Sequence, residues 1–199
     1  MTTRRLAALG ALAAVAASAG DLLMLWVANA RRPELGLPAP PDTVLWLGCA
    51  LGVAGIPLYA FGYQGAAGLL RPAHQRAAQT VIAGGAFAAG IGAAIHGMTA
   101  AMIASALQSN APAAPPLEEV AANGLLVAMW LAAALAVVVA SAVFAWCRRR
   151  DPALALANPA VVTVALVVLA LPSEWLRAFL APAAPNLAHL VFFLVCARR

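Results

Sequence analysis

Long apolar stretches separated by short breaks rich in proline or arginine constrain this chain more than any other feature. Of its 199 residues, 64% are hydrophobic and 10% are charged, whereas a soluble domain carries about 25% charged residues. A helix that crosses a bilayer needs about 20 mostly apolar residues. The composition therefore excludes an ordinary soluble domain, a disordered tail and a nucleic-acid-binding protein. It predicts an integral membrane protein.

Six apolar stretches predict an all-α polytopic bundle of six transmembrane helices in one membrane domain, residues 1–199. The breaks, such as RRPELGLPAPPDT and QSNAPAAPPLEE, are too short to fold separately. Pro172, Pro182 and Pro185 interrupt the last two stretches, and neighbouring helices tolerate such prolines in a membrane. We predict helices over residues 6–30, 44–63, 77–107, 120–146, 160–180 and 182–197.

The beginning of the chain has an alternative interpretation. Its MTTRR start, the apolar run and Ala17-Ser18-Ala19 are similar to a signal peptide with its cleavage site. The run continues through LLMLWVANA, however, which makes one segment long enough to span a bilayer. We therefore expect it to remain as the first transmembrane helix.

The placement of arginine predicts how the chain is oriented. All 12 basic residues are arginines, and cytoplasmic loops of membrane proteins are enriched in such residues. When the six helices alternate in direction, nine arginines fall on the side of the termini and three on the other. We predict that both termini are cytoplasmic and that the membrane is the bacterial inner membrane. The three arginines of the outer side are Arg31, Arg32 and Arg177.

A few ionisable side chains lie inside the predicted helices. Such groups are costly in a bilayer and by default mark a functional site. At 1.5 Å per residue, all of them fall about 9 to 16 Å from the outer ends of their helices. Four groups from distant parts of the sequence in one layer predict one shared polar pocket in the outer half of the bilayer. We predict four catalytic residues: Asp21, His96, Glu174 and His189.

Helical spacing adds neighbours to this set. Ser18 precedes Asp21 by three residues and Asn186 precedes His189 by three, so each pair shares a helix face. Asn123 lies near the start of a predicted helix on the same side, and Arg177 follows Glu174 by one turn. We predict four substrate-binding residues: Ser18, Asn123, Asn186 and Arg177.

Two histidines and two carboxylates suit two kinds of chemistry. They are ligands for zinc or another divalent metal, with Asp21, His96 and His189 as the candidates. They also suit acid–base catalysis on a lipophilic substrate. A haem between the two histidines is a weaker alternative. The sequence has no HExxH, GxSxG, SxxK or P-loop motif, so metalloprotease, serine-hydrolase and nucleotide-driven functions have no support.

Each of these residues also has a structural explanation. Asp21 would then be a protonated residue that hydrogen-bonds two helices together. Glu174 and Arg177, three apart on one helix, would form an interfacial ion pair. His96 and His189 would be packing histidines that satisfy their ring nitrogens inside the bundle.

Two short motifs resemble a known group of membrane enzymes. Gly20-Asp21-Leu22-Leu23 is similar to the Gly-Asp-x-Leu stretch of lysoplasmalogenase-like membrane proteins, and Ala188-His189-Leu190 is similar to a late histidine motif there. A similar set of Asp, Ser and His occurs in membrane-embedded lipid hydrolases that include the alkaline ceramidases. The resemblance implies a multi-helix enzyme that cleaves a lipid headgroup or amide, with zinc as a compatible cofactor. It also implies catalytic roles for Asp21 and His189.

Three functions follow from these observations. The leading hypothesis is an acid–base or metal-assisted enzyme that acts on a lipid or another lipophilic molecule. The rival is a proton-coupled carrier, in which Asp21 and Glu174 exchange protons while Pro57 and Pro172 permit rocking. The third is a non-catalytic accessory subunit with a structural polar set. The expected partners are the lipid bilayer and a lipophilic small molecule, without nucleic acid, and a homo-oligomer is compatible with all three.

Overall fold

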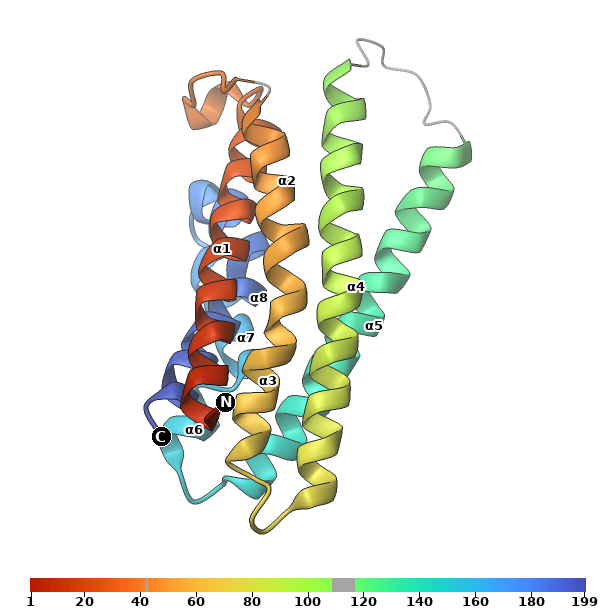
Figure 1. Cartoon of the computed structure of the whole chain (residues 1–199). Coiled ribbons are helices and arrows are strands. Elements are labelled where there is room, and N and C mark those ends of the chain that lie inside the picture. Colours follow the sequence, from red (N-terminus) through yellow and green to blue (C-terminus); the bar gives the residue numbers. More distant parts are fainter. Residues whose placement is uncertain (42, 109–116) are drawn as a thin grey trace.

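The computed structural model describes residues 1–41, 43–108 and 117–199, and for residues 117–122 it describes the backbone alone. These parts of the chain form helices and no strand. The elements in chain order are α1 (Thr3–Asn29), η1 (Pro33–Leu35), α2 (Thr43–Gly55), η2 (Ile56–Leu58), α3 (Tyr59–Gly68), α4 (Gln75–Gln108), α5 (Leu117–Cys147), α6 (Pro152–Leu156), α7 (Pro159–Ala170) and α8 (Glu174–Ala197) (Figure 1).

Five helical segments in the described residues are long and apolar enough to cross a membrane. The second of them combines α2, η2 and α3, because the chain continues through Pro57 without turning back (Figure 1). Large apolar side chains on the outside of the bundle, such as Leu12 and Leu131, are exposed as a lipid-facing surface requires. These observations confirm an all-α, membrane-type protein. The five segments are Thr3–Asn29, Thr43–Gly68, Gln75–Gln108, Asn123–Cys147 and Glu174–Ala197.

The last two helices differ from the predicted ranges of 160–180 and 182–197. The chain turns at residues 171–173, and α7 has only 12 residues, about 18 Å against a hydrocarbon core of about 30 Å. Ser173 begins α8 because its Oγ accepts a hydrogen bond from the amide of Leu176 at 3.4 Å, which is a strong N-cap. Pro182 does not end the helix, because the carbonyl of Ala178 that it leaves free lies 3.5 Å from the Asn29 Nδ2 donor.

Small residues let α1 pack closely against its neighbours. A Cβ atom on Gly10 would lie 2.4 Å from the Cα of Gly62 in α3, and one on Gly65 would lie 2.5 Å from the backbone nitrogen of Ala7. Such close approach is how membrane helices gain van der Waals contact. Helix α1 therefore packs against α2, α3 and α8, while α4 packs mainly against α5.

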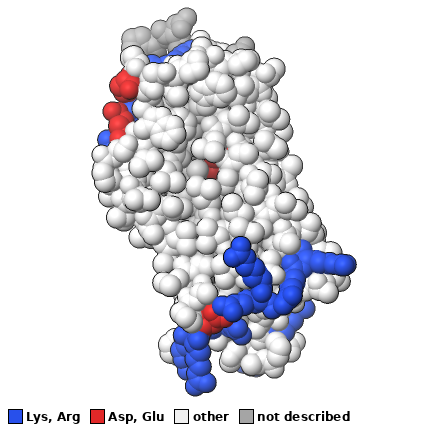
Figure 2. Space-filling model, turned by 90° about the vertical axis from the view of Figure 1, so that its left-hand side faces the viewer, with Lys and Arg blue, Asp and Glu red and all other residues white. Residues whose placement is uncertain are grey.

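The two ends of the bundle differ in charge. Both termini lie at one end (Figure 1), which we call the terminal end, and basic residues gather there (Figure 2). At this end Arg199 donates to Asp151 at 2.9 Å. At the opposite end Arg32 pairs with Glu34 and Glu174. On the face that Figure 2 shows, the surface between the two ends is almost free of charge, as a face in contact with lipid requires.

Candidate functional site

A cavity of 430 Å³ lies inside the bundle, with walls from α1, α3, α4, α5, α7 and α8. Most of the lining is apolar, and the polar side chains gather where α1, α3, α4 and α8 meet. Asp21 lies about 12 Å from the end of α1, and His96 about 18 Å from the end of α4. The cavity therefore reaches into the half of the bundle away from the termini. Its polar lining residues are Asp21, Tyr59, Tyr63, His96, Thr99, Thr163, Asn186 and His189.

A chain of polar contacts crosses the cavity wall from α3 to α4. The Tyr59 hydroxyl donates to Asn186 Oδ1 at 2.8 Å, and Asn186 Nδ2 donates to Asp21 Oδ2 at 2.7 Å. The other carboxyl oxygen, Asp21 Oδ1, lies 3.4 Å from His96 Nδ1. The side chain of Asp21 is 15% exposed and that of His96 is 5% exposed. Four helices thus hold one carboxyl group at the edge of the cavity.

The contact with Gly48 indicates the tautomer of His96. His96 Nε2 lies 3.1 Å from the carbonyl oxygen of Gly48, and because a carbonyl only accepts, Nε2 carries a hydrogen. Nδ1 then faces Asp21 Oδ1 at 3.4 Å. A hydrogen bond between these two atoms requires a proton, either on a neutral carboxyl group or on an imidazolium beside a carboxylate. The two side chains are therefore placed so that they can share a proton at the cavity.

Gly20 and Gly52 make room for His96, and Gly48 lets α1 approach α2 beside it. A Cβ atom on Gly52 would lie 2.1 Å from His96 Nε2, inside the imidazole ring's own space. A Cβ atom on Gly20 would lie 2.7 Å from the Gly48 carbonyl oxygen, so α1 and α2 meet only because both positions are glycine. The spacing Gly48-x-x-x-Gly52 is a small-residue packing signal that the sequence analysis did not use.

His189 also lines the cavity, but both of its ring nitrogens are occupied. Nδ1 lies 2.6 Å from the carbonyl oxygen of Pro185, so it carries the hydrogen, and Nε2 accepts from the Tyr63 hydroxyl at 2.7 Å. The ring also stacks on Tyr59, with centroids 4.9 Å apart. His189 is therefore a neutral imidazole held in place, and it positions both tyrosines. Sequence reasoning missed Tyr59 and Tyr63, although the chain's only two tyrosines are spaced one helical turn apart.

The donor set does not assemble into a metal centre. Among the residues that the structure describes, no group of three or more His, Cys, Asp and Glu side chains is placed to hold a metal ion. Asp21 and His96 are in contact, but His189 Nε2 is engaged by Tyr63. The structure therefore does not group Asp21, His96 and His189 as one ligand set, and a haem on His189 would have to displace the Tyr63 hydroxyl.

Glu174 lies outside the cavity, which corrects its expected placement in the shared pocket. It is the first residue of α8, is half exposed, and accepts a hydrogen bond from Arg32 Nη2 at 2.6 Å. The alternative, an ion pair with Arg177, is not found among the described residues, where the Arg177 guanidinium donates to the carbonyl oxygen of Leu171. The reason is the helix boundary: a residue expected inside a helix stands at its N-terminus, where a carboxylate is favourable.

The predicted substrate-binding residues divide in the same way. Asn186 lines the cavity and holds Asp21. Ser18 is buried and does not line the cavity, and its Oγ has no hydrogen-bond partner among the described residues. Asn123 is exposed near the start of α5, and Arg177 lies in the first turn of α8. Of the four, only Asn186 is placed to touch a bound molecule.

The cavity reaches the side of the bundle between α5 and α7. Trp130 and Val138 of α5 and Val164 of α7 line it, and these side chains are 45%, 50% and 64% exposed. Toward the terminal end Tyr63 lines the cavity, and its ring packs against the buried ring of Phe193. In a membrane the opening faces the lipid acyl chains.

Comparison with known proteins identifies a family without a function. The model of DUF6796, described as a family of unknown function, matches residues 1–198. No curated protein and no solved structure matches the chain. The chemistry of the site therefore has to be argued from its own residues.

Proposed function

We propose that this chain, which belongs to the DUF6796 family, is an inner-membrane enzyme that draws a lipophilic substrate from the bilayer and transfers a proton at its polar group. The observation that carries the proposal is the Asp21–His96 contact, 3.4 Å between Oδ1 and Nδ1, at the wall of a largely apolar cavity. Ligand sites have this make-up, with apolar walls and a few convergent polar groups. General acid–base catalysis needs a proton-exchanging group at that place.

In this proposal the chain crosses the membrane six times, with both termini in the cytoplasm. The fifth crossing consists of α6 and α7 together, since α7 alone is too short. The arginines at the terminal end (Figure 2) support this orientation through the excess of basic residues in cytoplasmic loops. The cavity then lies in the outer half of the bilayer.

The side chains have separate tasks. Asp21 and His96 are the acid–base pair, acting on the substrate or on a water molecule beside it. Asn186 and Tyr59 hold the carboxyl group in its orientation through their hydrogen bonds. The apolar part of the substrate lies against α5 and α7, where the cavity meets the lipid.

One observation favours an enzyme over a carrier. A transport path needs access from both faces of the membrane, whereas Tyr63 at the wall of this cavity packs against Phe192 and Phe193 on its terminal side, and each of the three is at most 2% exposed. An accessory subunit would not need a proton-sharing pair at an open cavity.

The test is turnover of membrane lipids by two matched variants. Full-length protein is reconstituted in vesicles of a total lipid extract from its host membrane, and the lipids are followed by mass spectrometry. Asp21→Asn and Glu174→Gln both exchange a carboxyl group for an amide, but only Asp21 lines the cavity. We expect a lipid species to be consumed by the wild type and by Glu174→Gln and to persist with Asp21→Asn. Equal lipid profiles with wild type and Asp21→Asn would contradict the proposal.

A further inference from the structure

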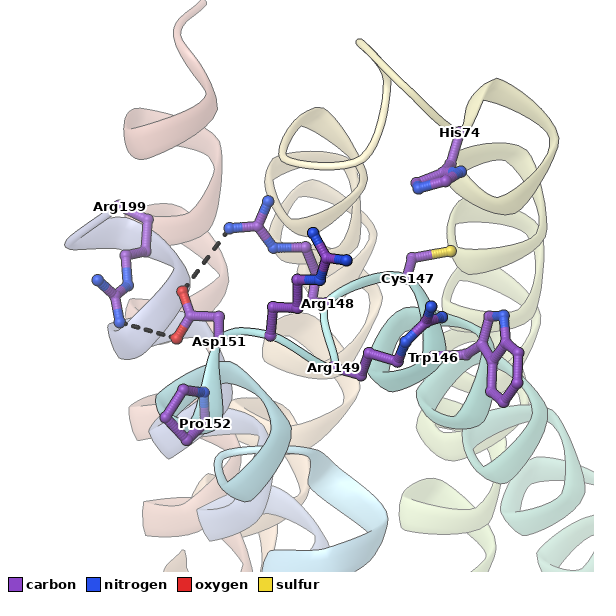
Figure 3. A pocket seen from close by; sticks show the side chains of 9 residues that line it. His74, Trp146, Cys147, Arg148, Arg149, Asp151, Pro152 and Arg199 are labelled. Atoms are coloured by element: carbon purple, nitrogen blue, oxygen red, sulfur yellow. Dashed lines mark hydrogen bonds and ion pairs between the residues drawn. The ribbon is translucent and has the colours of Figure 1, made fainter.

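A second pocket, of 780 Å³, lies at the terminal end of the bundle (Figure 3). Its walls come from the ends of α5 and α8, the start of α6, and His74 in the loop before α4. It shares no lining residue with the cavity described above. It is therefore a separate site that the proposed function does not use.

Positive charge dominates this pocket. Four arginines line it, Arg148, Arg149, Arg150 and Arg199, against the one carboxylate of Asp151. Asp151 Oδ1 accepts from Arg199 Nη2 at 2.9 Å, and its Oδ2 lies 3.7 Å from Arg148 Nη2. Four cations less one anion leave three positive charges facing the same space.

Several arginine donors here have no hydrogen-bond partner within the protein. In the described parts of the chain, no hydrogen bond joins the exposed guanidinium groups of Arg149 and Arg150 to a protein acceptor, and the buried Nε of Arg148 has no partner either. Figure 3 shows Arg148 and Arg149 between Trp146 at the end of α5 and the Asp151–Arg199 pair. An arginine fork matches the oxygen atoms of a phosphate group, which it binds through two parallel hydrogen bonds.

The surroundings of the pocket point to a lipid rather than to a free anion. Trp146, which is 72% exposed, lines it at the last turn of α5, and the Arg149 guanidinium lies 5.0 Å from its ring centroid. Exposed tryptophan beside arginine is typical of the level of the lipid headgroups, and basic pockets between membrane helices bind anionic headgroups. We propose that this pocket binds the phosphate headgroup of an anionic phospholipid, whose acyl chain runs along the end of α5.

The test compares two double variants that remove the same charge at the same end. Arg149→Gln with Arg150→Gln changes the pocket, whereas Arg71→Gln with Arg76→Gln changes exposed arginines that do not line it. Binding of phosphatidylglycerol and of phosphatidylcholine to the full-length protein is measured by native mass spectrometry, with circular dichroism as a control for folding. We expect the pocket variant to lose about 10- to 30-fold in affinity for phosphatidylglycerol, the loss typical of two interfacial arginines, and the control variant to keep most of it.

A third variant tests the same pocket in the other direction. Asp151→Asn keeps a side chain that caps α6 but removes the competing carboxylate, so phosphatidylglycerol should bind more tightly. Equal losses in the two double variants, or equal affinity for the two lipids, would overturn the proposal. So would displacement of phosphatidylglycerol by millimolar inorganic phosphate, which would identify a free-anion site.

Discussion

The two halves of the bundle use the same helices for opposite purposes. Toward the termini, Tyr63, Phe144, Phe192 and Phe193 are at most 2% exposed, and their rings meet at centroid distances such as 5.1 Å for Phe144 and Phe192. Farther from the termini, α1, α4 and α8 leave a cavity of 430 Å³ with a carboxyl group at its wall. Empty volume and buried polar groups both cost stability. Their combination in one half indicates a site that is kept for binding rather than for packing.

His189 and Tyr63 stand at the boundary between the halves. Their hydrogen bond of 2.7 Å closes the floor of the cavity, and the Tyr63 ring packs edge-on against Phe193. The ring of Tyr63 also fits against Gly85, where a Cβ atom would lie 2.1 Å from it. The difference between the halves therefore rests on side chains that a substitution can change one at a time.

The largest effect on stability is expected from removing volume in the packed half. Phe193→Ala should lower the free energy of unfolding in detergent by about 3–5 kcal/mol, because the buried ring leaves a cavity. The matched change adds volume in the open half: Ala133→Phe, on the cavity wall, should cost less, about 1–2 kcal/mol, because the added ring enters the cavity. Thermal unfolding followed by circular dichroism measures both. Similar costs for the two variants would mean that the halves are packed alike.

The next largest effect on stability is expected at Gly52, where His96 packs against α2. Gly52→Ala places a methyl group where the imidazole lies, so the ring must move and leave its contacts with Gly48 and Asp21. We expect a loss of about 2–4 kcal/mol from overpacking and the broken hydrogen bond. Gly90→Ala is the control, because a Cβ atom there meets nothing within 4 Å. The two alanine variants should differ in unfolding temperature, and an unchanged Gly52→Ala protein would refute this placement of His96.

The stability losses of two tyrosine variants should differ between the packed floor of the cavity and its open wall. Tyr63→Phe leaves the buried Nε2 of His189 without its donor, which should cost about 1–3 kcal/mol. Tyr59→Phe removes a hydroxyl at the open cavity, where water can replace it, so the expected loss is smaller, about 1 kcal/mol or less. Unfolding measurements that rank them in the reverse order would contradict a dry floor and an accessible wall.

The smallest effect is expected at the opposite end, outside both halves. Glu174→Gln breaks an exposed ion pair with Arg32, and such pairs contribute little and are screened by salt. Glu34 is the other partner of Arg32, and hydrogen bonds from the Glu34 backbone and from Arg32 hold the pKa of Glu34 below its ordinary value. The contribution of Glu34 to stability is therefore present at neutral pH and is lost as the pH falls through the acidic range. A large change in unfolding temperature for Glu174→Gln at high salt would contradict this assignment.

Much of the fold could be predicted because a bilayer requires long apolar helices. The observed helices α1, α4 and α5 lie within three residues of the predicted ends at 6–30, 77–107 and 120–146. The last two helices could not be placed, because the proline of a predicted break, Pro182, lies inside α8. The Asn29 side chain that compensates for it comes from a helix far away in sequence.

The candidate site could be predicted in part for a related reason. Depth along a helix brought Asp21, His96 and His189 into one layer, and all three line the cavity. The predicted position of Glu174 was wrong because the chain turns at residues 171–173, inside the predicted helix at 160–180. Tyr59, Tyr63 and the glycines beside His96 were missed, because their roles depend on which helix faces them, and helical period alone does not give that.

The central claim, that the cavity binds a lipophilic molecule, is tested most directly by identifying the molecules that remain bound to the purified protein. Full-length wild type, Ala133→Phe and Ala128→Phe are purified from the membrane in mild detergent, and native mass spectrometry records the bound molecules. Ala128 is exposed on the same helix and does not line the cavity. The account predicts a lipophilic molecule bound to the wild type and to Ala128→Phe and absent from Ala133→Phe. Equal occupancy in all three proteins would contradict it.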